Sequence, residues 1–279
     1  MSDKVVLYDK SERIATVTLN RPDQLNAWTG QMDMEYRAAM AEAEEDSDVR
    51  VIIVTGAGER GFCAGADMSL LSDLTSGGVS GSSITGDGSA VREVQLGDDV
   101  RDDFKQQYSF PMGMKKPVIC AVNGAAVGLG LVHTLYCDVR FASEKAKFST
   151  TFAQRGLIAE YGLAWLLPRL IGRNAAMDML LTARIVKADE AKSMGLVSEV
   201  YPAGELMDKV REYAGYIVDH CSPRSLGIIK RMTNNAQFET LEESCQIALT
   251  EMGESLGTEH FKEGVMSFME RRAPAFPDV

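Results

Sequence analysis

Two glycine-rich turns are places where the backbone itself can do chemistry. Residues 51–68 read VIIVTGAGERGFCAGADM, and residues 121–132 read AVNGAAVGLGLV. Each begins with a short β-branched apolar run, typical of a buried strand, and continues through small residues that let the backbone approach a ligand closely. Two such loops in one fold can aim a pair of backbone N–H groups at one oxygen. The pattern therefore predicts an oxyanion hole and chemistry on an acyl group.

A competing interpretation of the first turn is a dinucleotide site, because residues 56–61 match G-x-G-x-x-G after a predicted strand. A turn of that kind opens directly into a helix, and an acidic residue closes a second strand about 20 residues later. Here the turn continues into FCAGAD, and the stretch beyond Asp73 is rich in Gly and Ser without a strand pattern. The context favours the oxyanion hole over a nicotinamide cofactor site.

Length and composition are those of an ordinary globular protein. A chain of 279 residues buries about three-quarters of its unfolded surface and needs no disulfides. Its five cysteines and three histidines are scattered and form no CxxC pair, so we expect neither a metal site nor a disulfide framework. This cysteine usage favours a reducing compartment, and we expect a cytoplasmic protein.

Charge and hydropathy exclude two other classes of partner. The net charge of −11 argues against a general nucleic-acid surface, which is basic. The first residues, MSDKVVLYDKSERI, lack the apolar segment of a signal peptide. No stretch approaches the roughly 18 apolar residues of a membrane span, so we expect no membrane insertion.

The elements that position the turns alternate between strand and helix. The patterns predict strands at residues 5–8, 14–19, 51–55, 118–122 and 139–142, with a turn at 9–12 and helices at 31–45 and about 128–136. This alternation predicts an α/β core over residues 1–203. Residues 204–279 show helical patterns alone, at 205–219, 224–234, 241–256 and 260–271. One domain with a helical tail describes the chain almost equally well.

Two polar stretches follow the first glycine turn. Residues 76–89, SGGVSGSSITGDGS, predict either a flexible surface excursion or a lid over the site. The acidic residues 98–103 predict a solvated face.

Five motifs in order resemble those of the enoyl-CoA hydratase/isomerase (crotonase) superfamily. They are NRPDQLNA (20–27), GFCAGADM (61–68), KPVICAVNGAAVGLGL (116–131), CDVRFAS (137–143) and GLIAEYGLAWLLPRLIG (156–172). The resemblance covers residues 5–276 and implies a crotonase-like spiral of ββα repeats with a helical C-terminal region. It also implies a homotrimer or hexamer, and coenzyme A as part of the substrate rather than as a bound cofactor.

Carried over by position, the resemblance makes the backbone N–H groups of Ala66 and Leu129 the donors to the thioester oxygen. The backbone from Ala64 to Met68 would contact the adenine end of CoA, and Gly128 would lie at the substrate in the second turn. Which basic residues meet the CoA phosphates stays open, with Lys116 and Arg155 as candidates.

Three side chains beside these turns have two interpretations each. Asp67 is expected either to cap a helix that begins with MSLL or to lie against the substrate. His133 either packs in the core or forms a polar wall of the pocket. Cys63 is adjacent to the turn, but small buried cysteines are common and no base is expected beside it.

The position of the catalytic base decides the reaction. Hydratases of the family use two glutamates, whose positions here hold Val132 and Phe152. Glu160 instead resembles the single glutamate of Δ3,Δ2-enoyl-CoA isomerases, and its apolar neighbours Leu157, Ile158 and Leu163 are expected to raise its pKa if it is buried. Tyr161 is expected to orient Glu160 or to line the acyl pocket.

These residues predict Δ3/Δ2 double-bond isomerisation, with hydration as the alternative. Hydrolysis or C–C cleavage of another acyl-CoA also suits an enolate-stabilising site. A non-catalytic CoA-binding scaffold is the alternative from another class. The C-terminal residues Phe261, Phe268, Arg271 and Arg272 are expected to form an oligomer contact or to close a CoA site.

Overall fold

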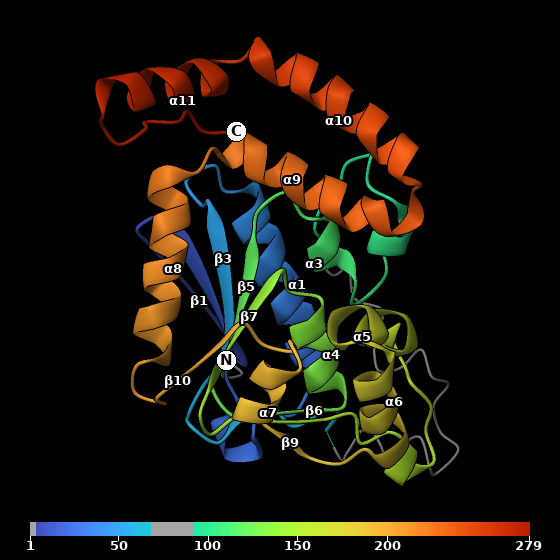
Figure 1. Ribbon diagram of the computed structural model, residues 1–279. Helices are drawn as coiled ribbons and strands as arrows, with labels where there is room; N and C mark the ends of the chain where they lie inside the picture. The colour runs from blue at the N-terminus through green and yellow to red at the C-terminus, as the bar shows by residue number, and fades with distance from the viewer. Residues whose placement is uncertain (1–3, 68–91) are drawn as a thin grey trace.

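Two sheets form the centre of the computed structural model, which describes residues 4–67 and 92–279 (Figure 1). The larger sheet runs in the order β1 (Val6–Ser11), β2 (Ile14–Leu19), β3 (Val51–Gly56), β5 (Val118–Val122), β7 (Val139–Ser143) and β10 (Glu199–Tyr201). The smaller sheet holds β4 (Gly61–Cys63), β6 (Ala125–Val127), β8 (Lys147–Ser149) and β9 (Val186–Lys187). All neighbouring strands are parallel except the pairs β1–β2 and β8–β9.

The chain visits the two sheets alternately. After β3 it enters β4, after β5 it enters β6, and after β7 it enters β8. Each repeat of the spiral therefore adds one strand to each of the two sheets. This repetition confirms the predicted α/β spiral. Each glycine-rich turn lies where the chain passes from the larger sheet to the smaller. Because successive repeats of the spiral stack on one another, the two glycine-rich turns lie side by side.

Strand β3 shows why this sequence forms a central strand. All six of its residues are buried, because helices cover both faces of the sheet. Ile52 and Val54 join the core on one side, whereas Val51 and Ile53 join a second apolar cluster on the other. The near-continuous run VIIVTG is therefore a strand buried on two faces.

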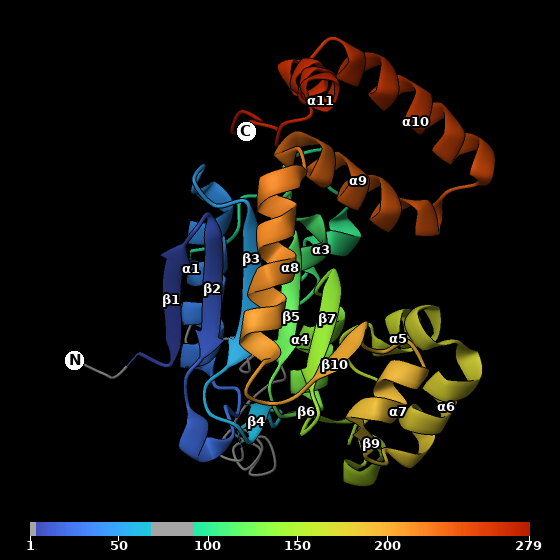
Figure 2. The ribbon, with the colours of Figure 1, turned by 60° about the vertical axis from the view of Figure 1, so that its left-hand side comes forward.

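Helices α1 (Gly30–Glu45) and α8 (Leu206–His220) lie on opposite faces of the larger sheet (Figure 2). The Thr29 hydroxyl caps α1 by accepting a hydrogen bond of 3.2 Å from the Met32 N–H. Leu206, Val210, Ala214 and Val218 repeat at helical spacing along α8 and pack on the sheet. The first helix of the predicted C-terminal region is thus part of the sheet's packing.

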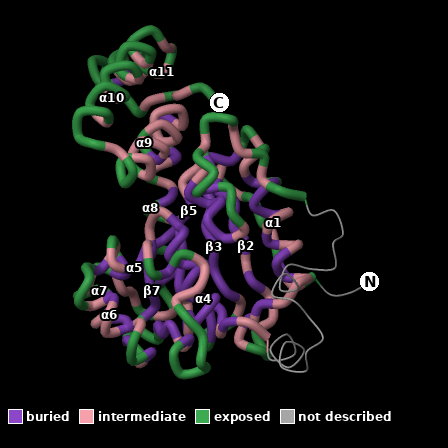
Figure 3. The backbone as a smooth tube through the Cα atoms, turned by 90° about the vertical axis from the view of Figure 1, so that its right-hand side faces the viewer, coloured by how far each residue is buried: buried purple, intermediate pink, exposed green. Residues whose placement is uncertain are grey.

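The remaining helices form two groups at the ends of the sheet. Beside the smaller sheet lie α4 (Leu129–Leu135), α5 (Leu163–Ile171), α6 (Arg173–Thr182) and α7 (Ala188–Ser193). At the other end lie the short α3 (Phe110–Gly113), then α9 (Pro223–Asn235), α10 (Leu241–Leu256) and α11 (Glu259–Glu270). Figure 3 shows a buried centre of sheet and α4, and mostly exposed α10 and α11. Helices were predicted within residues 204–279, and the structure has α8 to α11 and no strand there.

The first hairpin corrects one predicted boundary. Strand β1 continues to Ser11, so Asp9 and Lys10 pair with Thr16 and Ala15 instead of forming the turn. The turn is made by Glu12 and Arg13, both with positive φ (52° and 63°). Two consecutive positive φ values are those of a tight hairpin turn whose twist matches the strands. The prediction placed the turn by its polar residues, but a half-exposed edge strand is polar as well.

Within the described residues no helix is long and apolar enough to cross a membrane. Residues 76–89, with their alternative interpretations as excursion or lid, lie outside the described ranges, as does Met68.

Candidate active site

A cavity of about 510 Å³ collects the backbone and side chains that the sequence singled out. Four segments line it, at residues 21–27, 64–67, 128–129 and 151–161. Of the predicted site residues, the cavity brings together Ala64, Ala66, Asp67, Gly128, Leu129, Glu160 and Tyr161. The segments are far apart in sequence, and the spiral stacks them at one end of the strands.

The direction of the Ala66 backbone follows from a bridge with Trp28. The Trp28 N–H donates to the Gly65 carbonyl (2.8 Å), and the Asp67 N–H donates to the Trp28 carbonyl (2.9 Å). In a parallel bridge of this kind, the polar groups of the middle residue point the other way. The Ala66 N–H therefore turns away from Trp28, and in the described part of the chain it finds no acceptor.

The second N–H group stands at the start of α4. Leu129 is the first residue of that helix, and first-turn N–H groups have no partner within their own helix. Gly128 before it has a φ of +54°, which favours glycine. A Cβ at Gly65 would lie 4.0 Å from the Leu129 nitrogen, so the two turns are in close approach. Convergence of both N–H groups on one oxygen stays a prediction.

Glycine permits this approach at Gly130. A Cβ there would lie 2.0 Å from the carbonyl oxygen of Cys63, so any side chain would push α4 away from β4. Close packing also explains a glycine of the G-x-G-x-x-G match at residues 56–61. A Cβ at Gly56 would lie 2.7 Å from the Phe62 carbonyl oxygen. The turn after β3 also enters strand β4 rather than a helix.

Glu160 lies in the turn before α5 and lines the same cavity as the segments of Ala66 and Leu129. Its carbonyl accepts a hydrogen bond of 3.0 Å from the Leu163 N–H. Tyr161 and Gly162 follow with φ values of +54° and +77°. The hydroxyl of Tyr136 donates a hydrogen bond of 2.5 Å to the Tyr161 carbonyl, and burial raises the Tyr136 pKa to about 12. The phenol therefore stays a donor at every working pH.

The Glu160 carboxyl is half-buried, and this burial raises its pKa above the ordinary value. Among the described residues no group donates a hydrogen bond to it and none forms an ion pair with it. The predicted apolar surroundings need correction: Leu163 is buried and Leu157 lines the cavity, but Ile158 is 77% exposed. Ile158 faces solvent because the turn points it away from the cavity.

The positions at which family hydratases carry glutamates hold apolar side chains in the fold as well. Phe152 is 6% exposed and lines the cavity. Val132 is fully buried in α4. Neither transfers a proton. Burial also raises the pKa of the Cys63 thiol to about 12, so Cys63 is no nucleophile at neutral pH.

Asp67 pairs with Arg21 at the rim of the cavity. Its carboxylate lies 2.8 Å from the guanidinium, and each side chain is 18% exposed. The same guanidinium donates to the Ala27 carbonyl at 2.5 Å. Whether a helix begins after Asp67 falls outside the described residues, so the predicted cap stays a prediction.

Among the described residues that line the cavity, the basic ones are Arg21 and Arg155. Sequence reasoning missed Arg21, although it lies within the first family motif, because nothing in its neighbourhood marked it. The other candidate, Lys116, is not among the described residues that line this cavity. Its ammonium group donates to the carbonyls of Ala43 (2.7 Å) and Asp46 (2.5 Å), where it holds the C-terminal end of α1.

Of the two interpretations of His133, the structure agrees with packing in the core and not with the polar pocket wall, because His133 is buried and is not among the described residues that line the cavity. Its ring stacks on Trp28 with centroids 3.8 Å apart and contacts the edges of Tyr36 and Tyr108. Burial and the nearby Arg37 lower its pKa to about 3, so it stays neutral. Its Nε2 has no hydrogen-bond partner in the described structure. The helical face of α4 that holds His133 turns toward this aromatic cluster.

Comparison with known proteins agrees with this geometry. Residues 9–279 match the family model described as enoyl-CoA hydratase/isomerase. The chain is 36% identical to an (E)-benzylidenesuccinyl-CoA hydratase of Thauera aromatica, covering 97% of this chain and 98% of the relative. It is 32% identical to a 1,2-epoxyphenylacetyl-CoA isomerase of Escherichia coli, covering 97% of both. A crystal structure of an enoyl-CoA hydratase from Bacillus anthracis superposes with a TM-score of 0.84, at 28% identity over 98% of both chains.

Proposed function

The chain belongs to the enoyl-CoA hydratase/isomerase family of acyl-CoA enzymes, and from this premise we propose that it isomerises Δ3- to Δ2-enoyl-CoA thioesters with Glu160 as its one base. Membership in an enzyme family argues against the alternative of a non-catalytic scaffold. The names of the relatives include both hydratases and an isomerase, so the choice of reaction rests on the residues of the cavity.

The thioester carbonyl would accept hydrogen bonds from the Ala66 and Leu129 N–H groups. Removal of a proton from C2 places negative charge on that oxygen, and the C–H is a poor acid without help. Preorganised donors stabilise the charge as it forms, and one such donor is worth about 2.7–4 kcal/mol of barrier in other enzymes. Both N–H groups are held by backbone structure, so little reorganisation accompanies the reaction.

Glu160 would carry the proton. Its carboxylate takes the proton from C2, the electron pair of the broken C–H bond moves toward C1 and the carbonyl oxygen, and a dienolate results. The carboxylic acid then returns the proton at C4, while the double bond forms between C2 and C3. Atoms and charge balance without a water molecule, and a single carboxyl group suffices.

One observation carries this proposal: Glu160 lines the same cavity as Ala66 and Leu129, with a raised pKa and no bound partner in the described structure. A pKa nearer the working pH improves a group that must both accept and donate a proton. The other carboxylate among the described lining residues, Asp67, is paired with Arg21.

Hydration is the second candidate, supported by the hydratase names of several relatives. It would need a water molecule that is held and activated on one side of the double bond. Val132 and Phe152 cannot hold that water, so Glu160 would have to do so alone.

The test compares wild type with Glu160→Gln on trans-3-hexenoyl-CoA for isomerisation and on trans-2-hexenoyl-CoA for hydration. We expect isomerisation to dominate in the wild type and to fall about 10²–10⁴-fold in the variant. The affinity for hexanoyl-CoA, measured by calorimetry, should stay unchanged because glutamine keeps the shape. Dominant hydration would reverse the order of the two candidates, and full activity in the variant would place the base elsewhere.

A further inference from the structure

A second cavity, of about 650 Å³, adjoins Tyr161 as the first cavity does. Tyr161 lines both cavities, with Glu160 on the first and Gly162 on the second. An acyl group that continues along Tyr161 would enter this second cavity. No part of the reaction described above uses this space.

Aromatic side chains are the largest group among the thirteen described residues that line the second cavity, beside two aspartates, two glutamines and a serine. Six of its described lining residues are Phe104, Tyr108, Tyr136, Tyr161, Trp165 and Phe238. They come from four parts of the fold: the segment before α3, the end of α4, the start of α5 and the segment after α9. Such a set from distant segments is a feature of the tertiary structure rather than of one amphipathic helix.

The rings already contact one another with the geometry that aromatic groups prefer. Tyr108 meets Tyr161 edge to face at 4.7 Å, and Phe104 meets Phe238 edge to face at 6.0 Å. Trp165 stacks on Phe238 with centroids 5.3 Å apart. The Arg101 guanidinium lies 4.1 Å from the Phe238 centroid, and the Arg169 guanidinium lies 4.0 Å from the Trp165 centroid. Stacking and cation–π contacts therefore hold both rings in place.

The charges around the second cavity disfavour an ionised ligand. Its charged lining residues within the described structure are Asp102 and Asp103. Asp103 pairs with Arg101 at 3.0 Å, and Asp102 lies 3.4 Å from Lys105. A terminal carboxylate on the acyl group would lose water here and find no unpaired cation on the described wall.

We propose that the substrate is an acyl-CoA whose acyl group carries an uncharged aryl ring, which occupies this second cavity. This inference rests on the proposed function, because the aryl ring reaches the second cavity only if the thioester lies in the first. The space is ample, since a cavity of roughly 150 Å³ holds benzene in another protein. Edge-to-face contacts with Tyr161, Tyr108 and Phe238 would distinguish a ring from an aliphatic chain of equal reach.

Equilibrium binding tests this without requiring turnover. Calorimetry on the 279-residue chain compares four unreactive thioesters: hexanoyl-CoA, decanoyl-CoA, 6-phenylhexanoyl-CoA and adipoyl-CoA. We expect 6-phenylhexanoyl-CoA to bind about tenfold more tightly than decanoyl-CoA, which matches its reach, and adipoyl-CoA to bind most weakly. Phe238→Ala should remove most of the aryl preference, whereas the control Tyr216→Ala, an exposed tyrosine on α8, should keep it.

Each other outcome overturns the inference. Equal or tighter binding of decanoyl-CoA would make the occupant an aliphatic chain, and tightest binding of adipoyl-CoA would contradict the charge argument. Equal affinities for all four esters would mean that the second cavity is not used. Turnover of trans-3-hexenoyl-CoA in the same preparation tests the proposed function separately, so an active enzyme without aryl preference refutes the inference alone.

Discussion

The phenol of Tyr136 donates a hydrogen bond of 2.5 Å to the main-chain carbonyl of Tyr161, the residue that follows Glu160. This bond connects the end of α4, whose first residue is Leu129, to the turn that carries Glu160. Gly162 makes room for it, since a Cβ at that position would lie 2.5 Å from the Tyr136 hydroxyl. The turn of Glu160 and the start of α4 are therefore connected through one short helix and one hydrogen bond.

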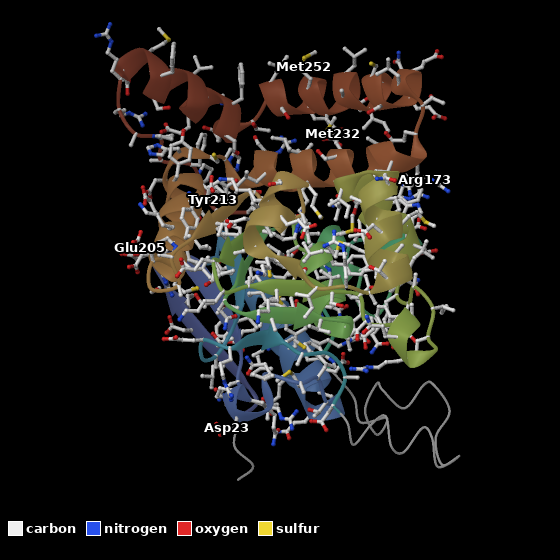
Figure 4. The ribbon with its side chains drawn as sticks, turned by 60° about the horizontal axis from the view of Figure 1, so that its bottom comes forward. Asp23, Arg173, Glu205, Tyr213, Met232 and Met252 are labelled. Carbon is white, nitrogen blue, oxygen red and sulfur yellow. The ribbon has the colours of Figure 1, made fainter. Side chains whose placement is uncertain are left out.

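Tyr136→Phe removes this hydrogen bond and keeps the ring. We expect kcat on trans-3-hexenoyl-CoA to fall about fivefold, because a lost hydrogen bond of about 1 kcal/mol loosens the turn. KM should change little, since the contacts to CoA remain. The matched control is Tyr213→Phe on α8 (labelled in Figure 4), which should leave both constants unchanged. A rise in KM with constant kcat would instead indicate a role in binding.

The pH dependence of the reaction follows from the raised pKa of Glu160. The base must be ionised to accept a proton, so kcat/KM should fall as the pH drops through this pKa, with a midpoint above the ordinary 4.5. Any residual activity of Glu160→Gln should lack this step. A midpoint at or below 4.5 would contradict the burial of the working base.

The raised pKa of Glu160 should also affect stability, but here the protonated form is the favourable one. Folding favours the protonated form of Glu160, so its contribution to stability is present below the unfolded pKa and is lost as the pH rises through the folded pKa. Glu160→Gln should therefore unfold at an equal or higher urea concentration than wild type at neutral pH.

Much of the fold was predictable from local patterns. The ranges of β2, β5 and α10 were predicted residue for residue, because each is a complete apolar or amphipathic run between polar or Gly/Pro boundaries. The strands of the smaller sheet were not predicted, since two or three residues show no periodicity. Helices α5 to α7 were missed as well, where Pro168 lies inside a helix and Gly162 and Gly172 flank it.

The site residues were likewise predictable only in part. Residues whose role depends on backbone position, such as Ala66 and Leu129, reached the same cavity through their motifs. Side-chain directions were harder to predict: Ile158 and His133 each turned away from the cavity, because tertiary packing rather than local sequence sets the direction. The pairing of Asp67 with Arg21 joins residues 46 positions apart and left no sequence signal.

The Arg21–Asp67 pair gives a prediction that separates positioning from catalysis. Asp67→Asn weakens the attachment of the Ala66 turn to the segment at Arg21, so we expect kcat/KM to fall by no more than about tenfold. If Asp67 were the base, the loss would be about 10²–10⁴-fold. A double-mutant cycle with Arg21→Met should give a coupling free energy of about 1 kcal/mol in urea unfolding. Additive effects would show that the pair contributes nothing.

We propose that α10 and α11 assemble the chain into a homotrimer or hexamer. These helices stand at the end of the molecule, and Met252 on α10 (labelled in Figure 4) and Phe268 and Met269 on α11 are each more than half exposed. An apolar surface of this kind is typical of a contact between chains. Arg272, which was predicted to join an oligomer contact or to close a CoA site, follows the end of α11 and forms ion pairs with Glu263 and Glu270 of that helix.

Light scattering at micromolar concentration checks the assembly. Wild type should have the mass of a trimer or hexamer, and Phe268→Asp combined with Met252→Asp should shift it toward the monomer. Leu181→Asp, at an exposed leucine on α6, serves as the control for added charge. A monomeric wild type with full activity would rule the assembly out.

Because His133 is buried and neutral, we expect the free energy of unfolding to decrease at acidic pH. With a pKa lowered to about 3, this histidine contributes stability that is present above its unfolded pKa of 6.5 and is lost as the pH falls toward 3. At pH 5 the unfolded chain binds the proton and the folded chain does not, which lowers the free energy of unfolding by about 2 kcal/mol.

His133→Phe removes the titrating group and keeps a ring against Trp28. Urea unfolding at pH 7 and pH 5 should therefore show a smaller loss for this variant than for wild type by about that amount, whereas His220→Phe on the exposed end of α8 should behave like wild type. The difference between the two pH values is the quantity that decides, because any change in packing affects both equally; an unchanged difference in His133→Phe would mean that His133 takes up its proton in the folded state.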